Sequence, residues 1–301
     1  MIIESLARFL VASHKVNPIR GNVLALGKQT IGITLSKALE IFQEQDCEVN
    51  PNFNLDDIKS DSVTRMRLNN LMDDESFFRL FGDVNYQTMD VSDYEQASII
   101  HNLNDPIPQN LEESFDFIID GGTFDHLFDL KTSFANVVKL LKPKGRVFQW
   151  NAASNYSNAG YLSFSADFFY DYYALNNFSD CQTFFAQSYF LGAQNWFISK
   201  FVPPAKSQRY PEFKQSYFYS MVIVLATKGE SSTYDQIPIQ LQYRDANLIE
   251  AYQKTVEKFD SQQLPLKPIP KRSVQMPWKY KFLYFFEPKS DSKVYQRIGW
   301  L

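Results

Sequence analysis

The sequence predicts an α/β protein in which a mostly parallel β-sheet is covered by helices on both faces. Three observations lead to this prediction. Short apolar runs alternate with longer segments of helical periodicity, which is the pattern of β-α-β units. Several of the runs end directly at Gly, Asp or Asn, as buried strands do where they enter a loop. The 301 residues are 45% hydrophobic, enough to build the core of such a sheet.

The first half of the chain is expected to supply a helix, a strand, a second helix, a short third helix and two more strands. In order, these cover residues 1–15, 23–26, 30–45, 74–82, the run that ends near Asp90 and the run that ends near Asn102. The interval between Gly27 and Asp90 is about three times what one strand–helix–strand unit needs. We therefore expect an inserted segment at about residues 46–80.

The second half is expected to close the sheet. Its elements are a strand at 115–119, a helix at 124–141, a strand at 146–150, an aromatic helix within 151–178, and strands at 181–190 and 216–227. The last two strands have no helix between them, which predicts a final hairpin and one antiparallel edge strand, with a second insertion at about 190–215. Residues 1–228 would form this domain, and 229–301 a C-terminal extension.

The extension contains a proline-rich, basic arm at residues 264–281, with no acidic residue between Leu264 and Phe286. A solvated tail is the simpler interpretation, but the aromatic residues of 278–286 argue against disorder. We expect the arm to pack on the domain or on a partner chain, so it is a candidate contact for a homo-oligomer.

Composition and charge exclude several classes of protein. The net charge of −4 argues against a protein that grips nucleic-acid phosphates. Two cysteines, Cys47 and Cys181, and three scattered histidines offer neither a disulfide framework nor a zinc spacing, so no metal is expected. Residues 1–15 include Glu4 and Arg8 and lack a basic leader, so they do not resemble a secretory signal. No run reaches the ~20 apolar residues of a membrane span. We therefore expect a cytoplasmic protein without membrane insertion.

Four segments, in this order, resemble the class I S-adenosylmethionine-dependent methyltransferases. They read "VLALG", "YQTMDVSDYE", "IIHNLNDPIP…SFDFIIDGGTFDHL" and "LLKPKGRVFQW". More narrowly, "LALGKQ", "DVSDYE" and "IDGGTFDH" are similar to methyltransferase-like proteins of the bacterial surface-sugar biosynthesis type. The resemblance implies a Rossmann-like, doubly wound sheet of seven strands. It also implies S-adenosylmethionine as the cofactor and a small-molecule or carbohydrate hydroxyl as the methyl acceptor.

The resemblance also implies which residues hold the cofactor. Gly27 would let the backbone approach its methionine part, since a side chain there would obstruct it, and the amides of the following loop would suit its carboxylate. Asp90, or Asp93 three residues on, would accept hydrogen bonds from the ribose hydroxyls. The implied cofactor-binding residues are Gly27, Lys28, Gln29, Asp90, Asn102, Leu103, Asp120, Gly121 and Gly122.

Asp120 and His126 are the implied catalytic residues, because a hydroxyl acceptor needs a base. His126 could equally be a core or capping residue, and Asp125 and Asp129 could simply complement a helix dipole. The loop after residue 150 would form the acceptor wall, with Asn151, Asn155, Tyr156 and Tyr161 as substrate-binding residues.

Two alternatives stay open from the sequence. The loop Gly27-Lys28-Gln29-Thr30-Ile31-Gly32 departs from the usual Gly-x-Gly-x-Gly pattern, which favours a catalytically inactive, methyltransferase-like binding or assembly module. Lys28 could instead pair with the cofactor carboxylate. A nicotinamide or nucleotide-sugar enzyme on another doubly wound sheet is disfavoured, because Gly27 does not begin a Gly-x-Gly-x-x-Gly fingerprint.

Overall fold

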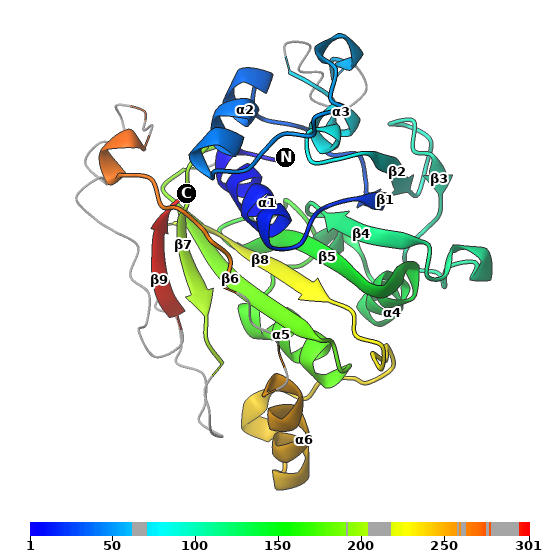
Figure 1. Cartoon of the computed structure of the whole chain (residues 1–301). Helices are drawn as coiled ribbons and strands as arrows, with labels where there is room; N and C mark the ends of the chain where they lie inside the picture. The colour runs from blue at the N-terminus through cyan, green and yellow to red at the C-terminus, as the bar shows by residue number, and fades with distance from the viewer. Residues whose placement is uncertain are drawn as a thin grey trace.

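The computed structural model describes residues 1–61, 71–190, 192–203, 218–257, 259, 263–274, 277 and 295–301. Within these residues, a single nine-stranded sheet forms the centre of the molecule, in the order β3-β2-β1-β4-β5-β8-β6-β7-β9 (Figure 1). The strands are β1 (Gly21–Leu26), β2 (Val84–Asp90), β3 (Ile99–Ile100), β4 (Phe115–Asp120), β5 (Leu141–Ser154), β6 (Asp180–Ser188), β7 (Phe197–Phe201), β8 (Tyr219–Thr227) and β9 (Tyr295–Trp300).

The pairing of the strands confirms a mostly parallel sheet with an antiparallel edge. The five strands from β3 to β5 pair in parallel, whereas β8 pairs antiparallel with both β5 and β6, and β7 pairs antiparallel with β6 and β9. Seven described strands therefore point one way, and β7 and β8 point the other.

The predicted number of seven strands was too low. One extra strand, β7, lies in the segment expected as an insertion, and the other, β9, lies in the C-terminal extension. Neither segment follows a helix in the way a β-α-β unit would, so strand–helix alternation could not indicate that they join the sheet. The expected hairpin partners β6 and β8 do pair, but β8 lies inside the sheet, between β5 and β6.

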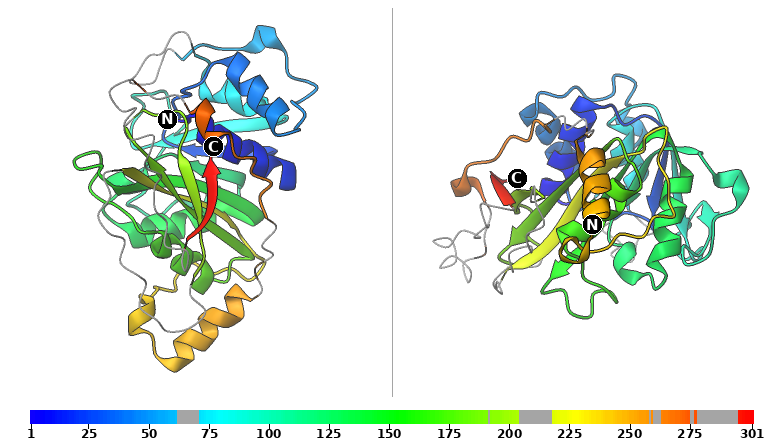
Figure 2. Two further views of the ribbon diagram at one scale, coloured as in Figure 1. Left: turned by 90° about the vertical axis from the view of Figure 1, so that its left-hand side faces the viewer. Right: turned by 90° about the horizontal axis from the view of Figure 1, so that it is seen from below.

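Helices cover both faces of the sheet, as a doubly wound fold requires (Figure 1). One face carries α1 (Glu4–Val16), α2 (Leu35–Glu44) and α3 (Asp74–Arg79), and the other carries α4 (Leu130–Leu140) and α5 (Ala166–Leu175). The sixth helix, α6 (Ala246–Val256), lies outside α5, away from the sheet (Figure 2). Successive strand residues alternate between the two cores, as Phe117 and Ile118 of β4 do, because strand side chains have a period of two.

Polar caps set where the helices begin. The expected helix at 30–45 starts only at Leu35, because Thr34 Oγ1 accepts the N–H of Lys37 at 3.2 Å. The expected helix at 124–141 is divided, because Asp129 Oδ1 accepts the N–H of Thr132 at 3.0 Å and thereby caps α4. The residues before this cap, Phe124–His126, form a separate 3-10 turn.

The C-terminal residues belong to the sheet. Besides the pairing of β9 with β7, Leu301 exchanges backbone hydrogen bonds with Trp196, and its carbonyl accepts Ser5 Oγ at 2.5 Å. In the arm, Lys267 Nζ donates to the Glu44 carbonyl at 3.2 Å and pairs with Asp46, so this part of the arm lies against the end of α2. Residues 278–294 of the extension lie outside the described residues.

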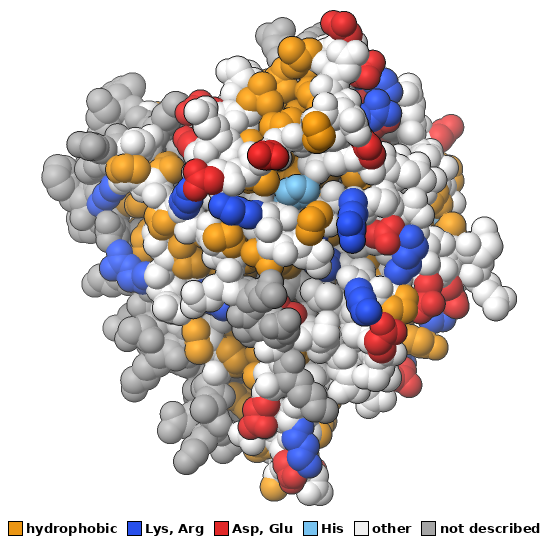
Figure 3. All heavy atoms as spheres, viewed as in Figure 1, with side chains coloured by type: hydrophobic (Ala, Val, Ile, Leu, Met, Phe, Trp, Pro, Cys, Tyr) orange, Lys and Arg blue, Asp and Glu red, His pale blue; other side chains and the backbone are white. Residues whose placement is uncertain are grey.

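Charges of both signs are interspersed on the face shown in Figure 3, which agrees with the balance of 30 basic and 34 acidic residues. Among the described helices, none combines the length and apolarity needed to cross a bilayer.

Candidate functional site

The strand order reverses between β1 and β4. From β1, the chain proceeds to β2 and β3 on one side and to β4 and β5 on the other. In open α/β sheets, ligands bind outside the carboxyl ends of the strands at this reversal. Gly27 follows β1, and Asp90 and Asp120 end β2 and β4. The register places Leu26 beside both Met89 and Asp120, so these strand ends lie at one edge of the sheet.

Two glycines at this edge have little around them. A Cβ on Gly27 would meet only Thr123 Oγ1, at 3.4 Å, and Asp90 Oδ2, at 3.8 Å, among the described residues. A Cβ on Gly122 would meet only Asp125 Oδ1, at 3.6 Å, in the same part of the structure. Both glycines have a positive φ, +70° and +90°, which L side chains rarely adopt. We call Gly27, Asp90, Gly122, Thr123 and Asp125 together the carboxyl-edge site.

Asp90 has an oxygen available for a ligand. Its Oδ1 accepts the N–H of Ser92 at 3.4 Å, while Oδ2 makes no hydrogen bond with any described residue. The backbone carbonyl of Asp90 accepts the N–H of His101, and Gly27 donates its own N–H to Met89, so the two strand ends are held rigidly beside each other. The structure thus places a half-exposed carboxylate next to Gly27.

The loop after β3 brings Asn102 and Leu103 to the same edge. Leu103 is buried, and its carbonyl accepts Ser133 Oγ at 3.1 Å and Asn136 Nδ2 at 3.0 Å. Its N–H makes no hydrogen bond within the described residues. Asn102 Oδ1 accepts both the N–H and the Nδ2 of Asn104, which leaves the Asn102 Nδ2 as its unused group. The expected strand here is shorter than predicted and ends at Ile100.

The loop after β1 differs from the expectation that its amides and Lys28 face a cofactor carboxylate. Lys28 Nζ forms an ion pair with Asp74 Oδ1 at 3.0 Å, and the N–H of Gln29 donates to Asp74 Oδ2 at 2.9 Å. Tyr86 donates its hydroxyl to the same oxygen at 2.8 Å. Asp74 is fully buried at the start of α3, within the segment predicted as an insertion. No local sequence pattern indicated this residue, because its contact with Gln29 spans 45 residues of chain.

Gln29 is itself buried, and its side chain folds back over the loop. Its Nε2 donates to the carbonyls of Leu26 and Gly27, at 3.1 and 3.0 Å. A Cβ on Gly121 would lie 1.9 Å from Gln29 Oε1 and 2.6 Å from Trp150, so Gly121 is glycine because Gln29 rests on it. The expected contact of Gly121 with a cofactor is therefore occupied by protein atoms on this side.

Asp120 is a fully buried carboxylate whose oxygens are already bonded. Oδ2 accepts the amides of Asn151 at 2.8 Å and Gln149 at 3.0 Å, and Oδ1 accepts the N–H groups of Thr123 at 2.8 Å and Phe124 at 3.4 Å. Burial raises the pKa of Asp120, although these donors favour the charged form. A base must contact the acceptor, and this carboxylate lacks such access. Asp120 instead shapes the loop that carries Gly122, Thr123 and Asp125.

Asp125 is the carboxylate that faces the open side of Gly122. The residue is 6% exposed, and its Oδ1 has no hydrogen-bond partner in the part of the chain that the structure describes. Burial raises the pKa of Asp125 to about 6, against the opposing effect of His126 and with a further contribution from Asp120. His126 Nε2 lies 3.8 Å from Asp125 Oδ1, and its side chain is 59% exposed. The sequence predicted only that Asp125 complements a helix dipole. Its position next to His126, directly after Asp120-Gly121-Gly122-Thr123-Phe124, was the feature that could have indicated a place in the site.

The structure places the four predicted substrate residues in different environments. Asn151 is buried and donates to Asp120, and its Oδ1 accepts no hydrogen bond within the described ranges. Asn155 is exposed and donates Nδ2 to the Phe218 carbonyl at 2.7 Å. Tyr156 packs against Tyr219, with ring centroids 5.6 Å apart. Tyr161 is 77% exposed, and its N–H donates to the Asp125 carbonyl at 2.7 Å, which ties this loop to the carboxyl-edge site.

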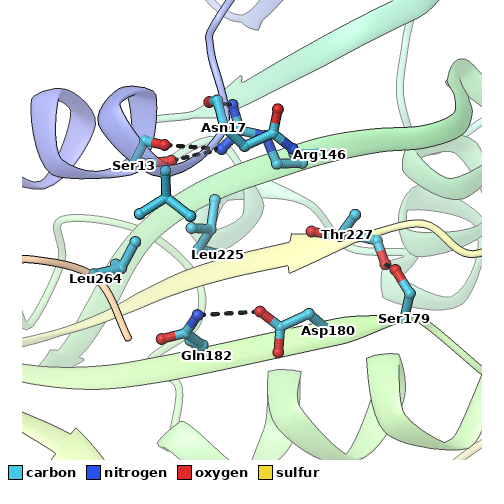
Figure 4. A pocket seen from close by; sticks show the side chains of 10 residues that line it. Ser13, Asn17, Arg146, Ser179, Asp180, Gln182, Leu225, Thr227 and Leu264 are labelled. Carbon is cyan, nitrogen blue, oxygen red and sulfur yellow. Dashed lines mark hydrogen bonds between the residues drawn. The ribbon is translucent and has the colours of Figure 1, made fainter. Parts of the chain in front are cut away.

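A separate cavity of about 230 Å³ lies at the opposite, amino end of β5 and β6 (Figure 4). Arg146 lines it, and is buried without an acidic partner in the described part of the chain. Its guanidinium donates to Ser13 Oγ at 2.8 Å and to the carbonyls of Ser13 and Asn17, which are C-terminal groups of α1. Burial lowers the pKa of Arg146 to about 10. We interpret Arg146 as the C-terminal cap of α1.

No group of three or more His, Cys, Asp or Glu side chains is arranged to hold a metal ion in the described ranges.

No protein-family model matches the sequence, and no curated protein matches it. Solved structures do show similarity. They include the CMeT domain of the citrinin polyketide synthase (TM-score 0.37, 9% identity, 75% of this chain and 52% of that chain). Another is Haemonchus contortus phosphoethanolamine N-methyltransferase 2 in complex with S-adenosyl-L-methionine (TM-score 0.38, 10% identity, 73% and 52%). A third is TehB from Haemophilus influenzae (TM-score 0.36, 13% identity, 73% and 61%).

The chain therefore covers between about half and three-fifths of these structures. The structures that it resembles include two that are named as S-adenosylmethionine-dependent methyltransferases, from Methanococcus maripaludis and Thermotoga maritima. With identities of 9–13% and TM-scores below 0.5, these similarities carry no argument about the ligand or reaction of this chain. The α/β doubly wound fold rests on the observed strand order and on helices covering both faces of the sheet.

Proposed function

We propose that the protein is an S-adenosylmethionine-dependent methyltransferase that acts on a small molecule, with a sugar hydroxyl as the acceptor that the sequence favours. The observation that carries this proposal is the placement of the Asp90 carboxylate beside the uncrowded side of Gly27, at the reversal of strand order. A carboxylate with a free oxygen there can accept hydrogen bonds from both hydroxyls of a ribose.

The other groups at the edge fit the nucleoside half of this cofactor. The free N–H of Leu103 and the free Nδ2 of Asn102 are donors suited to the ring nitrogens of an adenine. The side chain of Leu103 is buried. Thr123 lies beside Gly27, where its Oγ1 donates to the Leu26 carbonyl at 2.7 Å, and Asp125 Oδ1 lies beside Gly122.

The bound cofactor would supply a methyl group on a positively charged sulfur, which is transferred by in-line displacement. The chain then has to orient the acceptor and remove its proton, and orientation alone contributes up to ~7–11 kcal/mol in such reactions. Asp125 is the alternative group to take the proton: it is nearly as buried as Asp120, but its Oδ1 accepts no hydrogen bond from the described residues and its pKa is raised to about 6. The exposed His126 could pass that proton to solvent, since it lies beside Asp125.

Calorimetry with the purified chain tests the proposal. We expect S-adenosylmethionine to bind and to raise the melting temperature. Absence of both heat and a thermal shift at millimolar cofactor would contradict it.

The second candidate function is a methyltransferase-like binding or assembly module without catalysis. The observation that favours it is the Gln29 side chain, which rests on Gly121, together with the ion pair of Lys28 with Asp74. Cofactor binding without turnover across a broad panel of acceptors would favour the module over the enzyme. A nicotinamide enzyme would show binding of NAD in the same experiment.

A further inference from the structure

Among the described residues between α2 and β2, Asp74 contacts the loop that follows β1 through its side chain. Asp74 is the first residue of α3 and is fully buried. Both of its oxygens are engaged. Oδ1 contacts Lys28 Nζ at 3.0 Å and accepts the N–H of Glu75 at 3.1 Å, whereas Oδ2 accepts the Gln29 N–H at 2.9 Å and the Tyr86 hydroxyl at 2.8 Å.

These contacts use the groups of the loop that would attract a ligand carboxylate. Lys28 is the only cationic side chain between Gly27 and Gly32, and the Gln29 N–H is one of the loop amides. A buried carboxylate that accepts a backbone N–H and pairs with an ammonium group is the arrangement expected for a bound amino-acid carboxylate. In this protein, the chain itself provides that carboxylate.

The charge around Lys28 reinforces this conclusion. Its side chain is 16% exposed. Burial disfavours its charged form, but Asp74, and more weakly Asp73 and Asp61, raise the pKa of Lys28 above its ordinary value. Lys28 therefore stays protonated, and the acidic residues around it outnumber it. A ligand carboxylate brought to this loop would be repelled by Asp74, and Lys28, the cation that could pair with it, is already paired with Asp74.

Gln29 adds a steric reason. Its carboxamide is bonded to two carbonyls and lies on Gly121, so it covers the backbone on the side of the loop that faces β4 and β5. The space beside Gly27, Gly122 and Asp90, in contrast, stays uncrowded. The side of Gly27 that faces Asp90 is open, whereas Lys28 and the Gln29 N–H, the loop groups that would bind an amino-acid carboxylate, are engaged by Asp74.

We propose that Asp74 acts as a built-in carboxylate for the loop after β1, so that the site recognises its ligand through the nucleoside and not through an amino-acid carboxylate. This inference rests on the proposed function. It explains what the inserted segment contributes, and it predicts that nucleosides without an amino-acid tail bind as well as the full cofactor.

Two ligands that differ only in the tail test this with the unmodified chain. S-adenosylhomocysteine carries the carboxylate and the amino group, and 5′-methylthioadenosine lacks both. We expect calorimetry to give dissociation constants within about tenfold of each other, the ratio that corresponds to ~1.4 kcal/mol. A preference for S-adenosylhomocysteine above that ratio would overturn the inference and leave the proposed function standing. If neither ligand binds, the proposed function fails, and the inference fails with it.

The Asp74→Asn variant provides the converse test. The amide keeps an oxygen for the Gln29 N–H and the Tyr86 hydroxyl but removes the charge that pairs with Lys28. We expect affinity for S-adenosylhomocysteine to rise at least about tenfold, while affinity for 5′-methylthioadenosine stays the same. Equal changes for the two ligands would contradict the role of Asp74. Should the variant fail to fold, the comparison in the unmodified chain still decides.

Discussion

Asp120 Oδ2 and Asn151 Nδ2 are hydrogen-bonded at 2.8 Å, and this contact joins the ends of the neighbouring strands β4 and β5. The other oxygen of Asp120 accepts two N–H groups of the loop that follows β4. A residue whose sequence context suggested contact with a cofactor thus builds the frame on which Gly122, Thr123 and Asp125 are held. The hydrogen bonds of Asp120 therefore position these residues in the structure.

Replacing Asp120 should therefore cost stability. The Asp120→Ala variant leaves the buried amides of Gln149 and Asn151 without an acceptor, and each unsatisfied buried group costs about 1–3 kcal/mol. We expect the free energy of unfolding in urea to fall by about 3 kcal/mol or more. Asp129→Ala is the matched control, since Asp129 is an exposed helix cap whose loss costs about 1 kcal/mol. Equal losses in the two variants would mean that the buried network contributes little.

Asp90 should control cofactor affinity. Hydrogen bonds to a charged group contribute about 1.5–3 kcal/mol, so Asp90→Ala should weaken binding of S-adenosylmethionine by about 10- to 100-fold. Calorimetry measures this directly. Asp93→Ala is the control, because Asp93 is the nearby acid whose side chain is exposed. A larger loss of affinity in Asp93→Ala than in Asp90→Ala would show that Asp93, and not Asp90, binds the ribose.

Asp125 should make stability depend on pH. The pKa of Asp125 in the folded state, about 6, lies above its ordinary 3.8, so the folded chain binds this proton more tightly than the unfolded chain. Its ionisation therefore weakens the fold as pH rises from about 4 to above 6. Asp125→Asn removes this effect and should be more stable than the natural chain at pH 8, by about 2–3 kcal/mol, but not at pH 4. Urea unfolding at the two pH values gives the comparison. If the variant and the natural chain differed in unfolding free energy by the same amount at pH 4 and at pH 8, folding would not raise the pKa of Asp125.

His126 should affect turnover without affecting cofactor binding. Its side chain is exposed and lies 3.8 Å from Asp125 Oδ1, which allows proton exchange but makes little contribution to packing. For His126→Ala we expect unchanged affinity for S-adenosylmethionine and a rate about 10²–10⁴-fold lower, the usual contribution of a positioned acid or base. A variant that turns over at the natural rate would show that His126 has no part in the chemistry.

The ion pair of Arg244 with Asp171 should hold α6 against α5. The two side chains are 2% and 5% exposed, and Asp171 Oδ1 also accepts the Tyr252 hydroxyl at 2.9 Å. Arg244→Met leaves a buried carboxylate without its cation, which costs about 3–5 kcal/mol. Lys254→Met is the control, because the Lys254–Glu250 pair is exposed and contributes ~0.3–0.5 kcal/mol. Amide exchange of α6 should accelerate only in the first variant.

The order of strands and helices was largely readable from the sequence because it depends on local patterns. The ends of β1, β2 and β4 fall at or next to Leu26, Asp90 and Ile119, as the apolar runs indicated. The two added strands were not readable. The first, β7, lies in a segment without clear periodicity, and the second, β9, is separated from its partner by almost a hundred residues.

By itself, the sequence determined which residues arrive at the carboxyl edge, since the end of a parallel strand is set by its apolar run. Only the tertiary structure decided what each of them does there. Asp120 is enclosed by amides from β5, Lys28 is paired by a carboxylate from α3, and Asp125 Oδ1 accepts no hydrogen bond from any described residue. The reason is physical: the availability of a charged group depends on the neighbours that bury it, and these neighbours come from distant parts of the chain.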